Sequence, residues 1–390
     1  MTTPIKLVFL ARSLDYGGAQ RQLISLAKAL DKKRFHVTVL TFYHGPLAQE
    51  LNGHGVQVIS LDKKGRWDIF GFLLRLVRLL RLARPDVVHA YLDIPHLLSL
   101  ILKPFVRTRV VWGLRTSTIE LDQYDWLHRL ASRAEKWCSR FADLIIINSN
   151  TGLEQHVARG LPRKKMLVIP NGFDTEVFKP DREAGAKQRS AWRVQEQTQL
   201  LGIVGRLDPM KDHQNFFRAA ALVSKKMNDV SLTEASAGNR GEVRFVCVGD
   251  GPANYLEGLK ALAKDLGISE RVIWQEATTA VAAVYNALDV LVSSSRAEGL
   301  SNAVGEAMAC GVACVTTDVG DSRLLVGECG SVVPAQNSEA LAEGIIRSLS
   351  GKQPELGNVA RERIVAHFSV QRLAQLTEEA LVSVADSGRS

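Results

Sequence analysis

The sequence lacks the signatures of the commonest metal and nucleotide sites. It contains no Asp-x-Asp motif, no metal-binding spacing among its nine histidines, no Walker loop and no glycine fingerprint of dinucleotide-binding proteins. Its five cysteines are odd in number and lie mostly in apolar runs, and Cys310 and Cys314 have no second pair nearby. These features argue against a zinc site and favour reduced, buried thiols in a cytosolic protein. We expect no metal and no other cofactor.

Long hydrophobic runs are also missing, so no stretch reaches membrane-spanning length. The first apolar run, Ile5–Ala11, is too short for a signal peptide or a span and indicates the first core strand. A hydrophobic content of 46% and a charged content of 23% are ordinary for a soluble globular protein. With 390 residues, the chain is long enough for two domains that each bury a core.

Charge is spread unevenly along the chain. Residues 1–180 hold 27 Lys and Arg against 15 Asp and Glu, a net charge of 27 − 15 = +12. Residues 181–390 hold 22 and 26, a net charge of −4, which gives the total of +8. This asymmetry indicates an anionic partner for the N-terminal half. No aromatic and basic stacking pattern supports nucleic acid, which leaves an acidic membrane surface as the expected partner.

Short apolar runs alternate with helical segments throughout, which is typical of parallel sheets with helices on both faces. We expect strands at residues 6–10, 37–41, 56–61, 86–90, 109–112, 143–147 and 166–169, and then at 200–204, 243–248, 272–274, 290–292 and 313–316. A polar stretch with Pro180 and Gly185 separates the two sets. The pattern predicts an α/β fold of two doubly wound, Rossmann-like domains, residues 1–180 and 181–390, which face each other across a cleft.

The most informative motif joins a short strand to a helix of small residues. Glu298 and Glu306 lie on either side of this junction, with seven residues between them. The backbone amides of Leu300, Ser301 and Asn302 would point out of the helix N-terminus, where anions bind. A phosphate flanked by two carboxylates that accept hydrogen bonds from sugar hydroxyls describes a nucleotide sugar. The alternative is a chance pattern in which Glu306 simply faces solvent.

Three further turns could supply the groups that such a site needs. Gly17 and Gly18 remove side chains at a helix start, where a ligand would approach the backbone. Arg206 and Lys211 follow a strand of the second domain, and Gly249 begins a tight turn after the next one. In each case the alternative is an ordinary structural turn or a surface cation. Because no Asp-x-Asp is present, Arg206, Lys211 and helix amides would neutralise a leaving group instead of Mg²⁺.

Taken together and in this order, the motifs resemble glycosyltransferase family 4, the large retaining group with the two-domain GT-B fold. The matching pieces extend over nearly the whole chain and are Gly17-Gly18-Ala19-Gln20, Pro170-Asn171-Gly172-Phe173-Asp174, Gly205-Arg206 with Lys211, Gly249-Asp250-Gly251-Pro252 and Glu298-x7-Glu306. The resemblance implies a metal-independent retaining hexosyltransferase. It also implies an N-terminal acceptor-side domain and a C-terminal nucleotide-sugar domain whose last helix can pack back on the first.

The resemblance assigns roles to individual residues of the second domain. Arg206 and Lys211 would bind the donor diphosphate and stabilise its departure, while Glu298 would contact the transferred sugar and Glu306 the ribose hydroxyls. The two carboxylates would act in binding, and not as the acid and base of a hydrolase.

Backbone groups would complete the donor site. The amides of Leu300 and Ser301 would bind the phosphate, and Gly249 would line the site. The Gly17-Gly18 loop would cover the diphosphate from the opposite domain.

One position departs from the family pattern. Where many relatives carry a His near the sugar, at the end of the fifth strand, this sequence has Arg115. An Arg cannot act as a general base but could hold an anionic group of the acceptor or donor. This departure puts the acceptor-side chemistry in doubt and leaves a binding-only relative as an alternative to an enzyme. His89 and His96 are expected to be structural.

Two predicted helices of the basic half carry cations along one face. Residues 68–84 place Arg75, Arg78 and Arg81 on one arc. Residues 127–141 carry a basic stripe of Arg129, Arg133, Lys136 and Arg140, with an apolar side of Leu130, Ala134, Trp137, Cys138 and Phe141. The alternative is that each helix packs its apolar face on the sheet and leaves the cations in water. The net charge favours docking on an anionic membrane surface.

The sequence therefore predicts an enzyme that moves a hexose from a nucleotide sugar, with UDP assumed as a frequent donor nucleotide, to a glycan or lipid-linked acceptor. Polysaccharide or lipopolysaccharide synthesis at the cytoplasmic face of the plasma membrane is the expected setting. The same chemistry on a soluble acceptor is the alternative, and no nucleic acid is expected to bind.

Overall fold

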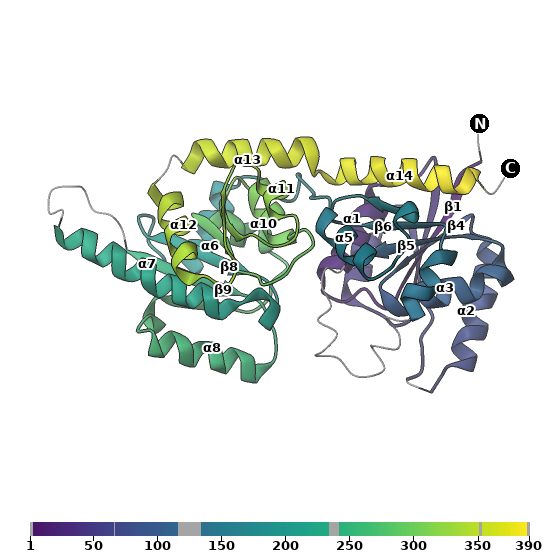
Figure 1. Ribbon diagram of the computed structural model, residues 1–390, viewed down its shortest axis with the longest axis horizontal. Coiled ribbons are helices and arrows are strands. Elements are labelled where there is room, and N and C mark those ends of the chain that lie inside the picture. The colour runs from purple at the N-terminus through teal and green to yellow at the C-terminus, as the bar shows by residue number, and fades with distance from the viewer. Residues whose placement is uncertain (1–2, 66, 116–133, 234–241, 351–352, 388–390) are drawn as a thin grey trace. The chain divides into compact units, whose positions relative to one another are not determined.

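The computed structural model describes residues 3–65, 67–115, 134–233, 242–350 and 353–387. It divides into two compact units, which Figure 1 traces from purple to yellow. Unit 1 comprises Met1–Gly172 and Val370–Ser390, and unit 2 comprises Phe173–Ser369. The chain thus leaves unit 1 ahead of the polar stretch around Pro180, and it returns at Val370, so that the last helix belongs to unit 1.

Unit 1 is built on a seven-stranded parallel sheet in the order β3-β2-β1-β4-β5-β6-β7. The strands are β1 (Ile5–Ala11), β2 (Phe35–Thr41), β3 (Val56–Ser60), β4 (Val87–Tyr91), β5 (Arg109–Leu114), β6 (Leu144–Ile147) and β7 (Met166–Val168). Their near-continuous apolar sequences match strands that are buried on both faces. Each strand lies within two residues of its predicted position at either end.

Helices connect these strands. They are α1 (Gly18–Ala29), α2 (Phe70–Ala83), α3 (Asp93–Val106), α5 (Asn150–Ala158) and α14 (Val370–Asp386), with short 3₁₀ turns η1 (Pro46–Leu51), η3 (Ser139–Phe141) and η4 (Arg163–Lys165). Residues 134–138 are also helical. The first part of the predicted helix at 127–141, with Arg129 and Arg133, lies outside the described residues. In α2, the four-residue spacing of Phe72, Leu76 and Leu80 turns all three side chains into the core.

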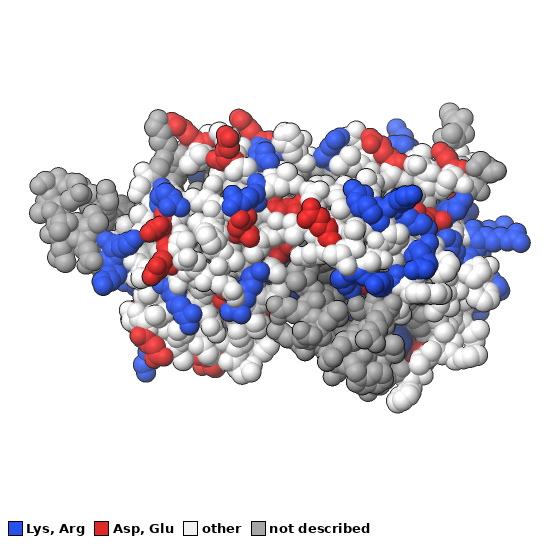
Figure 2. Space-filling view, viewed as in Figure 1, with Lys and Arg blue, Asp and Glu red and all other residues white. Residues whose placement is uncertain are grey.

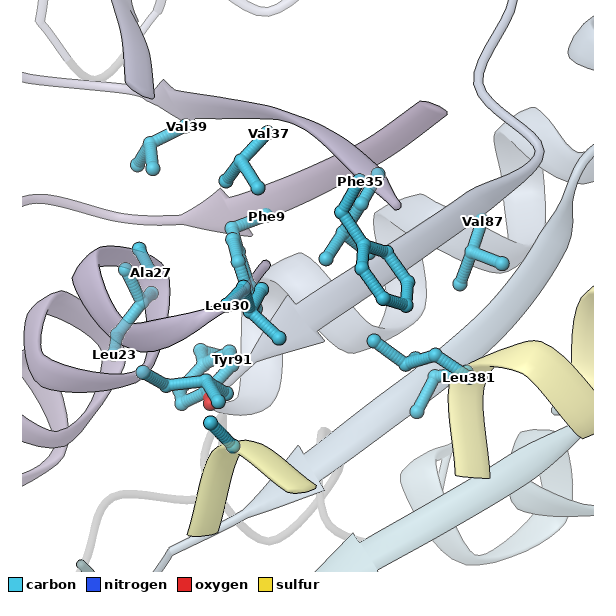
Figure 3. Packing of buried hydrophobic residues seen from close by; sticks show 14 of the residues in the cluster. Phe9, Leu23, Ala27, Leu30, Phe35, Val37, Val39, Val87, Tyr91 and Leu381 are labelled. Atoms are coloured by element: carbon cyan, nitrogen blue, oxygen red, sulfur yellow. The ribbon is translucent and has the colours of Figure 1, made fainter. Parts of the chain in front are cut away.

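The C-terminal helix α14 contributes to the core of unit 1. Figure 3 shows Leu381, from this yellow helix, beside Phe35 and Val87 of the sheet. Glu378, which is 8% exposed, accepts hydrogen bonds from the Asp31 amide and from Arg34 Nη1, both at 2.7 Å. Apolar burial and a charged contact therefore fix the last helix to the unit that contains the first.

Unit 2 repeats the same architecture with six parallel strands in the order β10-β9-β8-β11-β12-β13. The strands are β8 (Gln199–Val204), β9 (Val243–Val248), β10 (Val272–Gln275), β11 (Val290–Ser293), β12 (Ala313–Thr317) and β13 (Ser331–Val333). Both units therefore follow the strand order 3-2-1-4-5-6 of a Rossmann-type fold, which confirms the predicted fold class. The edge strand β13 was not predicted, because Ser331-Val332-Val333 contains only two apolar residues and forms no apolar run of strand length.

The helices of unit 2 are α6 (Arg182–Ala191), α7 (His213–Thr233), α8 (Ala253–Asp265), α9 (Val281–Ala287), α10 (Asn302–Ala309), α11 (Ser322–Val326), α12 (Ser338–Ser350) and α13 (Gln353–His367), with turns η5 (Pro209–Lys211) and η6 (Ser269–Arg271). Asp181 caps α6 by accepting a hydrogen bond from the Ala184 amide at 2.9 Å. Within the described ranges, no helix combines the length and the apolar character needed to cross a bilayer.

A close contact fixes helix α10 within unit 2. A Cβ atom added at Gly305 would lie 2.0 Å from Cζ of Phe173, whose side chain is 1% exposed. The absence of a side chain at Gly305 therefore lets the helix pack directly against a buried aromatic ring.

Replacing Gly305 by Ala should lower the free energy of unfolding by about 1–3 kcal/mol, because the added methyl group overpacks the Phe173 ring. Gly258 is the matched control, since it lies in α8 with no atom within 4 Å of an added Cβ. Gly258→Ala should stabilise the protein by about 0.5–1 kcal/mol through helix propensity. Urea denaturation of the two variants measures both changes, and equal effects would contradict the packing role.

Candidate functional site

The candidate site of unit 2 begins where strand β11 ends. Thr317 Oγ1 donates a hydrogen bond to the Ser295 carbonyl at 2.7 Å, and the Asp321 amide donates to the Gly299 carbonyl at 2.8 Å. A Cβ atom added at Gly320 would lie 2.3 Å from the Glu298 carbonyl oxygen. The residues after β12 thus support the turn that carries Glu298.

Lys211 and Glu298 meet in this turn. Lys211 Nζ donates a hydrogen bond to Glu298 Oε1, and Ser295 Oγ donates to the same oxygen at 2.8 Å. The Lys211 side chain is 30% exposed and the Glu298 side chain 14%, so the pair is partly shielded but open to a ligand. The structure therefore brings together two of the predicted site residues that are far apart in sequence.

A set of polar contacts holds Lys211 in place. Ser294 Oγ lies 2.9 Å from the carbonyl oxygens of Lys211 and Asp212, and the Arg296 amide donates to the Met210 carbonyl at 2.8 Å. The Arg296 guanidinium pairs with the Asp212 carboxylate at 3.2 and 3.3 Å, and Asp212 is 4% exposed. These contacts join the loop after β8 to the loop after β11.

Helix α10 begins at Asn302, one residue before the start that the motif predicted, with Ser301 as its N-cap residue. Leu300 and Ser301 are 4% and 3% exposed. Both residues are therefore more enclosed than the open anion site that was predicted at this helix N-terminus. Ser301 Oγ is buried and makes no hydrogen bond within the described part of the chain. A small cavity beside it is lined by Gly205, Lys211 and Ser301 among others.

Glu306 lies one turn along α10 and is half-buried. Its Oε2 accepts a hydrogen bond from the Tyr285 hydroxyl at 2.8 Å. Tyr285 belongs to α9 and is 1% exposed, so this contact fixes the carboxylate relative to a buried ring. Glu306 therefore does not simply face solvent.

Arg206 takes a different position from Lys211. Its side chain is 75% exposed, and Nη2 lies 3.1 Å from Asp208 Oδ2. Such an exposed ion pair holds a side chain only weakly, because both groups remain hydrated. Arg206 is thus free to reorient toward a ligand.

The turn at Gly249 packs on the loop that carries Arg206. Gly249 has a φ of +149°, and a Cβ atom at this position would lie 1.9 Å from the Gly205 carbonyl oxygen. The Leu207 amide donates to the Asp250 carbonyl at 2.8 Å. Gly249 is required here because the two backbones approach each other closely. From the sequence, this structural role and ligand binding were alternatives of equal weight.

Gly17 and Gly18 lie in unit 1. Gly17 is the N-cap residue of α1, in an extended conformation, and Gly18 is the first residue of the helix. Gly18 is exposed and Gly17 half-exposed, so the start of this helix is open to solvent, and their predicted contact with a ligand stays a prediction.

Buried beside the candidate site is His213, which is 0% exposed and packs edge-on to Tyr255 with ring centroids 5.9 Å apart. Burial, helped by the charge of Lys211, lowers the pKa of His213 from 6.5 to about 4. The imidazole is therefore neutral at pH 7. Among the described residues, no three His, Cys, Asp or Glu side chains are grouped as metal ligands.

Two family descriptions match consecutive parts of the chain. Residues 16–177 match Glycosyltransferase Family 4, and residues 198–351 match Glycosyl transferases group 1. The two matches contain all the site residues described above. The chain belongs to glycosyltransferase family 4. The resemblance predicted from the motifs is thereby confirmed.

Individual relatives of this family 4 chain are distant. A D-inositol 3-phosphate glycosyltransferase of Mycobacterium marinum is 31% identical over 238 residues, which cover 58% of this chain and 47% of the relative. The match thus spans about half the length of that relative. EpsF of Bacillus subtilis, which is named as a glycosyltransferase, is 23% identical over 397 residues that cover 97% of this chain and 94% of EpsF.

Solved structures share the fold over nearly the whole chain. Anabaena HepE, determined in complex with UDP and glucose, superposes with a TM-score of 0.82 at 23% identity, covering 97% of this chain and all of HepE. WaaG, a glycosyltransferase involved in lipopolysaccharide biosynthesis, superposes with a TM-score of 0.71 at 18% identity, covering 97% and 99%. At these identities the likeness concerns the fold alone.

Sequence reasoning missed the residues that hold the two loops of the candidate site in place. Ser294, Asp212, Arg296 and Gly320 of this family 4 chain each fix one of the two loops, yet none belongs to a motif. The run of three serines after β11 was the available signal, because small hydroxyl residues ahead of a carboxylate can bond the neighbouring backbone.

The burial of His213 should make stability depend on pH. Between about pH 4 and 6.5 the unfolded chain binds a proton at this residue and the folded chain does not, so the free energy of unfolding falls as the pH falls through this range. The loss amounts to at most about 3 kcal/mol. Urea titrations at several pH values should therefore give a smaller pH dependence for His213→Gln than for the wild type.

His367→Gln is the control for this comparison, because His367 is exposed and lies in the same unit. Its pH dependence should equal that of the wild type. An unchanged dependence in His213→Gln would contradict the neutral, buried state of His213.

Proposed function

We propose that the protein is a metal-independent, retaining glycosyltransferase that moves a hexose from a UDP-sugar to a lipid-linked or polysaccharide acceptor in cell-envelope glycan synthesis. The observation that carries this proposal is the meeting of Lys211 and Glu298 beside the N-terminus of α10. A cation, a helix N-terminus and a carboxylate at one place suit the phosphate and the hydroxyl groups of a nucleotide sugar.

In the proposed reaction, Lys211 leaves Glu298 when the donor binds and pairs with the diphosphate. Glu298 is then free to accept a hydrogen bond from a hydroxyl of the transferred sugar. Arg206, which is exposed and weakly held, adds a second cation as the diphosphate departs. Glu306, fixed by Tyr285, accepts hydrogen bonds from the ribose.

Retention is proposed from the family resemblance. The acceptor hydroxyl attacks the face of the sugar from which the diphosphate leaves, and a phosphate oxygen takes the proton of this hydroxyl. The carboxylates of Glu298 and Glu306 hold the substrate in this scheme and transfer no proton.

The choice of UDP is supported by HepE, which binds UDP and glucose in its solved structure. WaaG supports an envelope glycan as the product, since it acts in lipopolysaccharide biosynthesis. A soluble acceptor is the second candidate, because the Mycobacterium marinum relative is named for a small inositol phosphate.

Calorimetric titration tests the donor site. Wild-type protein should bind UDP more tightly than GDP, and Glu306→Ala should weaken UDP binding about 10- to 100-fold through loss of the ribose hydrogen bonds. Glu257→Ala is the control, because Glu257 lies on the exposed side of α8. Unchanged UDP affinity in Glu306→Ala would remove the ribose assignment, and a wild type that binds neither nucleotide would remove the proposed function.

For the membrane, we propose docking through a basic apolar surface of unit 1. It consists of exposed apolar side chains with arginines around them, namely Phe70, Leu74, Leu82, Ile101, Phe105, Trp137 and Phe141 with Arg78, Arg81, Arg84, Arg107 and Arg140. Trp137 and Phe141 are 63% and 53% exposed, so the predicted apolar side of that helix does not pack entirely on the sheet. Arg75 is not part of this surface, because it pairs with Asp68.

Contacts within unit 1 connect the parts of this surface, and Lys103 of α3 joins its two groups by donating a hydrogen bond from Nζ to the Phe141 carbonyl at 3.0 Å. Arg81 Nε lies 3.4 Å from the Phe105 carbonyl, which links the ends of α2 and α3. The rings of Trp137 and Phe141 are 6.1 Å apart, and the Arg140 guanidinium lies 5.3 Å from the Trp137 ring.

The charge of the whole unit suits the same partner. Unit 1 carries 28 Lys and Arg against 16 Asp and Glu, a net charge of 28 − 16 = +12. Figure 2 shows cations gathered over this unit, whereas cations and anions are interspersed on the visible face of unit 2. Apolar side chains framed by arginines match an anionic lipid surface.

Vesicle sedimentation tests the docking surface. Vesicles rich in phosphatidylglycerol should pellet the protein at low salt and release it at high salt, whereas phosphatidylcholine vesicles should not pellet it. The variant with both Arg78→Gln and Arg81→Gln should bind about 30-fold more weakly, since each cation near an anionic leaflet contributes about 1 kcal/mol.

Val359→Ser serves as the control, because Val359 is 50% exposed on α13 of unit 2. It should bind vesicles as the wild type does. Binding that is independent of lipid composition, or unchanged in the double arginine variant, would remove the docking proposal.

A further inference from the structure

The carboxyl edge of the unit 1 sheet holds a buried cation that the proposed donor site does not use. Arg115 directly follows β5 and is 9% exposed. Its Nη1 donates a hydrogen bond to Asn171 Oδ1 at 3.0 Å, and its Nη2 donates to the Tyr91 hydroxyl at 3.2 Å. Nε is buried and has no hydrogen-bond partner among the residues that the structure describes. Both partners of the guanidinium are neutral groups.

No ion pair compensates this charge within the described ranges. Lys103, Arg109 and His96 of the same unit each pair with a carboxylate, but no described Asp or Glu pairs with Arg115. The nearby His89 is fully buried, and its pKa is lowered well below the usual value by burial and by the charge of Arg115. Buried charges in proteins are normally paired, so an uncompensated guanidinium indicates a missing anion.

The surroundings of Arg115 are firmly held. Gln22 makes two hydrogen bonds with Gly172, donating to its carbonyl at 3.0 Å and accepting from its amide at 2.9 Å. This pair of bonds also restrains Asn171, which directly precedes Gly172. The Tyr91 ring, which is 2% exposed, lies 5.4 Å from the guanidinium carbon. The guanidinium is therefore held in place by its Nη1 and Nη2 atoms, while its buried Nε–H group has no partner among the described residues.

The location also favours a ligand. In parallel α/β sheets, ligands bind at the carboxyl ends of the strands, where Arg115 and Tyr91 both lie. A guanidinium is the side chain best suited to bind an oxyanion, because its planar N–H groups match the geometry of phosphate and carboxylate.

We propose that Arg115 binds an oxyanion, a phosphate or carboxylate group, on the acceptor substrate. This inference rests on the proposed function, in which Arg206 and Lys211 of unit 2 already serve the diphosphate of the donor. The anion at Arg115 then belongs to the other substrate. An Arg at this position thus favours an anionic acceptor over a neutral one.

Inorganic phosphate is the probe that tests this site. The full-length protein is first saturated with UDP, so that the cations of unit 2 are occupied, and phosphate then replaces chloride at constant ionic strength. The thermal unfolding midpoint of the wild type should rise with phosphate concentration, because a ligand that binds only the folded state stabilises it. In Arg115→Met, apparent phosphate affinity should fall by about tenfold or more.

Arg372→Met is the matched control, because Arg372 is exposed on α14 of the same unit and belongs to neither proposed surface, and it should respond to phosphate as the wild type does. A phosphate response of Arg115→Met equal to that of the wild type would overturn the proposal. A response that disappears once UDP is bound would also overturn it, because the anion would then belong to the donor. UDP binding itself reports separately on the proposed function.

A second measurement tests the same site even if the Arg115→Met variant does not fold. In ¹⁵N-labelled wild-type protein with UDP bound, the Nε–Hε resonance of Arg115 should shift on addition of phosphate, and Arg115→Lys identifies this resonance by its loss. A resonance that does not move at phosphate concentrations that shift the unfolding midpoint would place the anion elsewhere and overturn the proposal.

Discussion

An ion pair between Lys211 and Glu298 ties together the two loops that carry the candidate donor site. One loop follows the first strand of the unit 2 sheet and the other follows its neighbour, so the contact forms only when both strands are correctly paired. The ion pair between Asp212 and Arg296 joins the same two loops a second time. In the proposed function, this ion pair is neutral as a whole without substrate, and Lys211 exchanges Glu298 for the diphosphate when the donor binds.

The two units use the same Rossmann-type architecture for different purposes. Unit 2 has a net charge of −4 and concentrates its chemistry in a few cations beside a helix N-terminus. Unit 1 carries the excess positive charge, of which Arg115 is buried at the sheet edge while Arg78 and Arg81 of α2 are exposed. In the proposed function, this division assigns the donor to unit 2, and the acceptor and its membrane to unit 1.

Much of the fold and part of the site could be predicted because they depend on local sequence. Apolar runs of strand length located almost all strands, and the Glu298-x7-Glu306 spacing located α10. The contact of Lys211 with Glu298 was beyond prediction, since it joins residues 87 positions apart. The exposure of Trp137 and the enclosure of Ser301 depend on which neighbours cover them, and periodicity along one helix does not contain that information. Arg115 was noticed as an unusual residue, but only the tertiary structure shows that no described Asp or Glu pairs with it.

Titration of Glu298→Gln with UDP is the most direct test of the exchange at Lys211. Removing the carboxylate frees Lys211 from its internal partner and removes a negative charge near the diphosphate. The variant should therefore bind UDP at least as tightly as the wild type, although it loses a contact to the transferred sugar. Markedly weaker UDP binding by Glu298→Gln would contradict the exchange, because Glu298 would then support the diphosphate site itself.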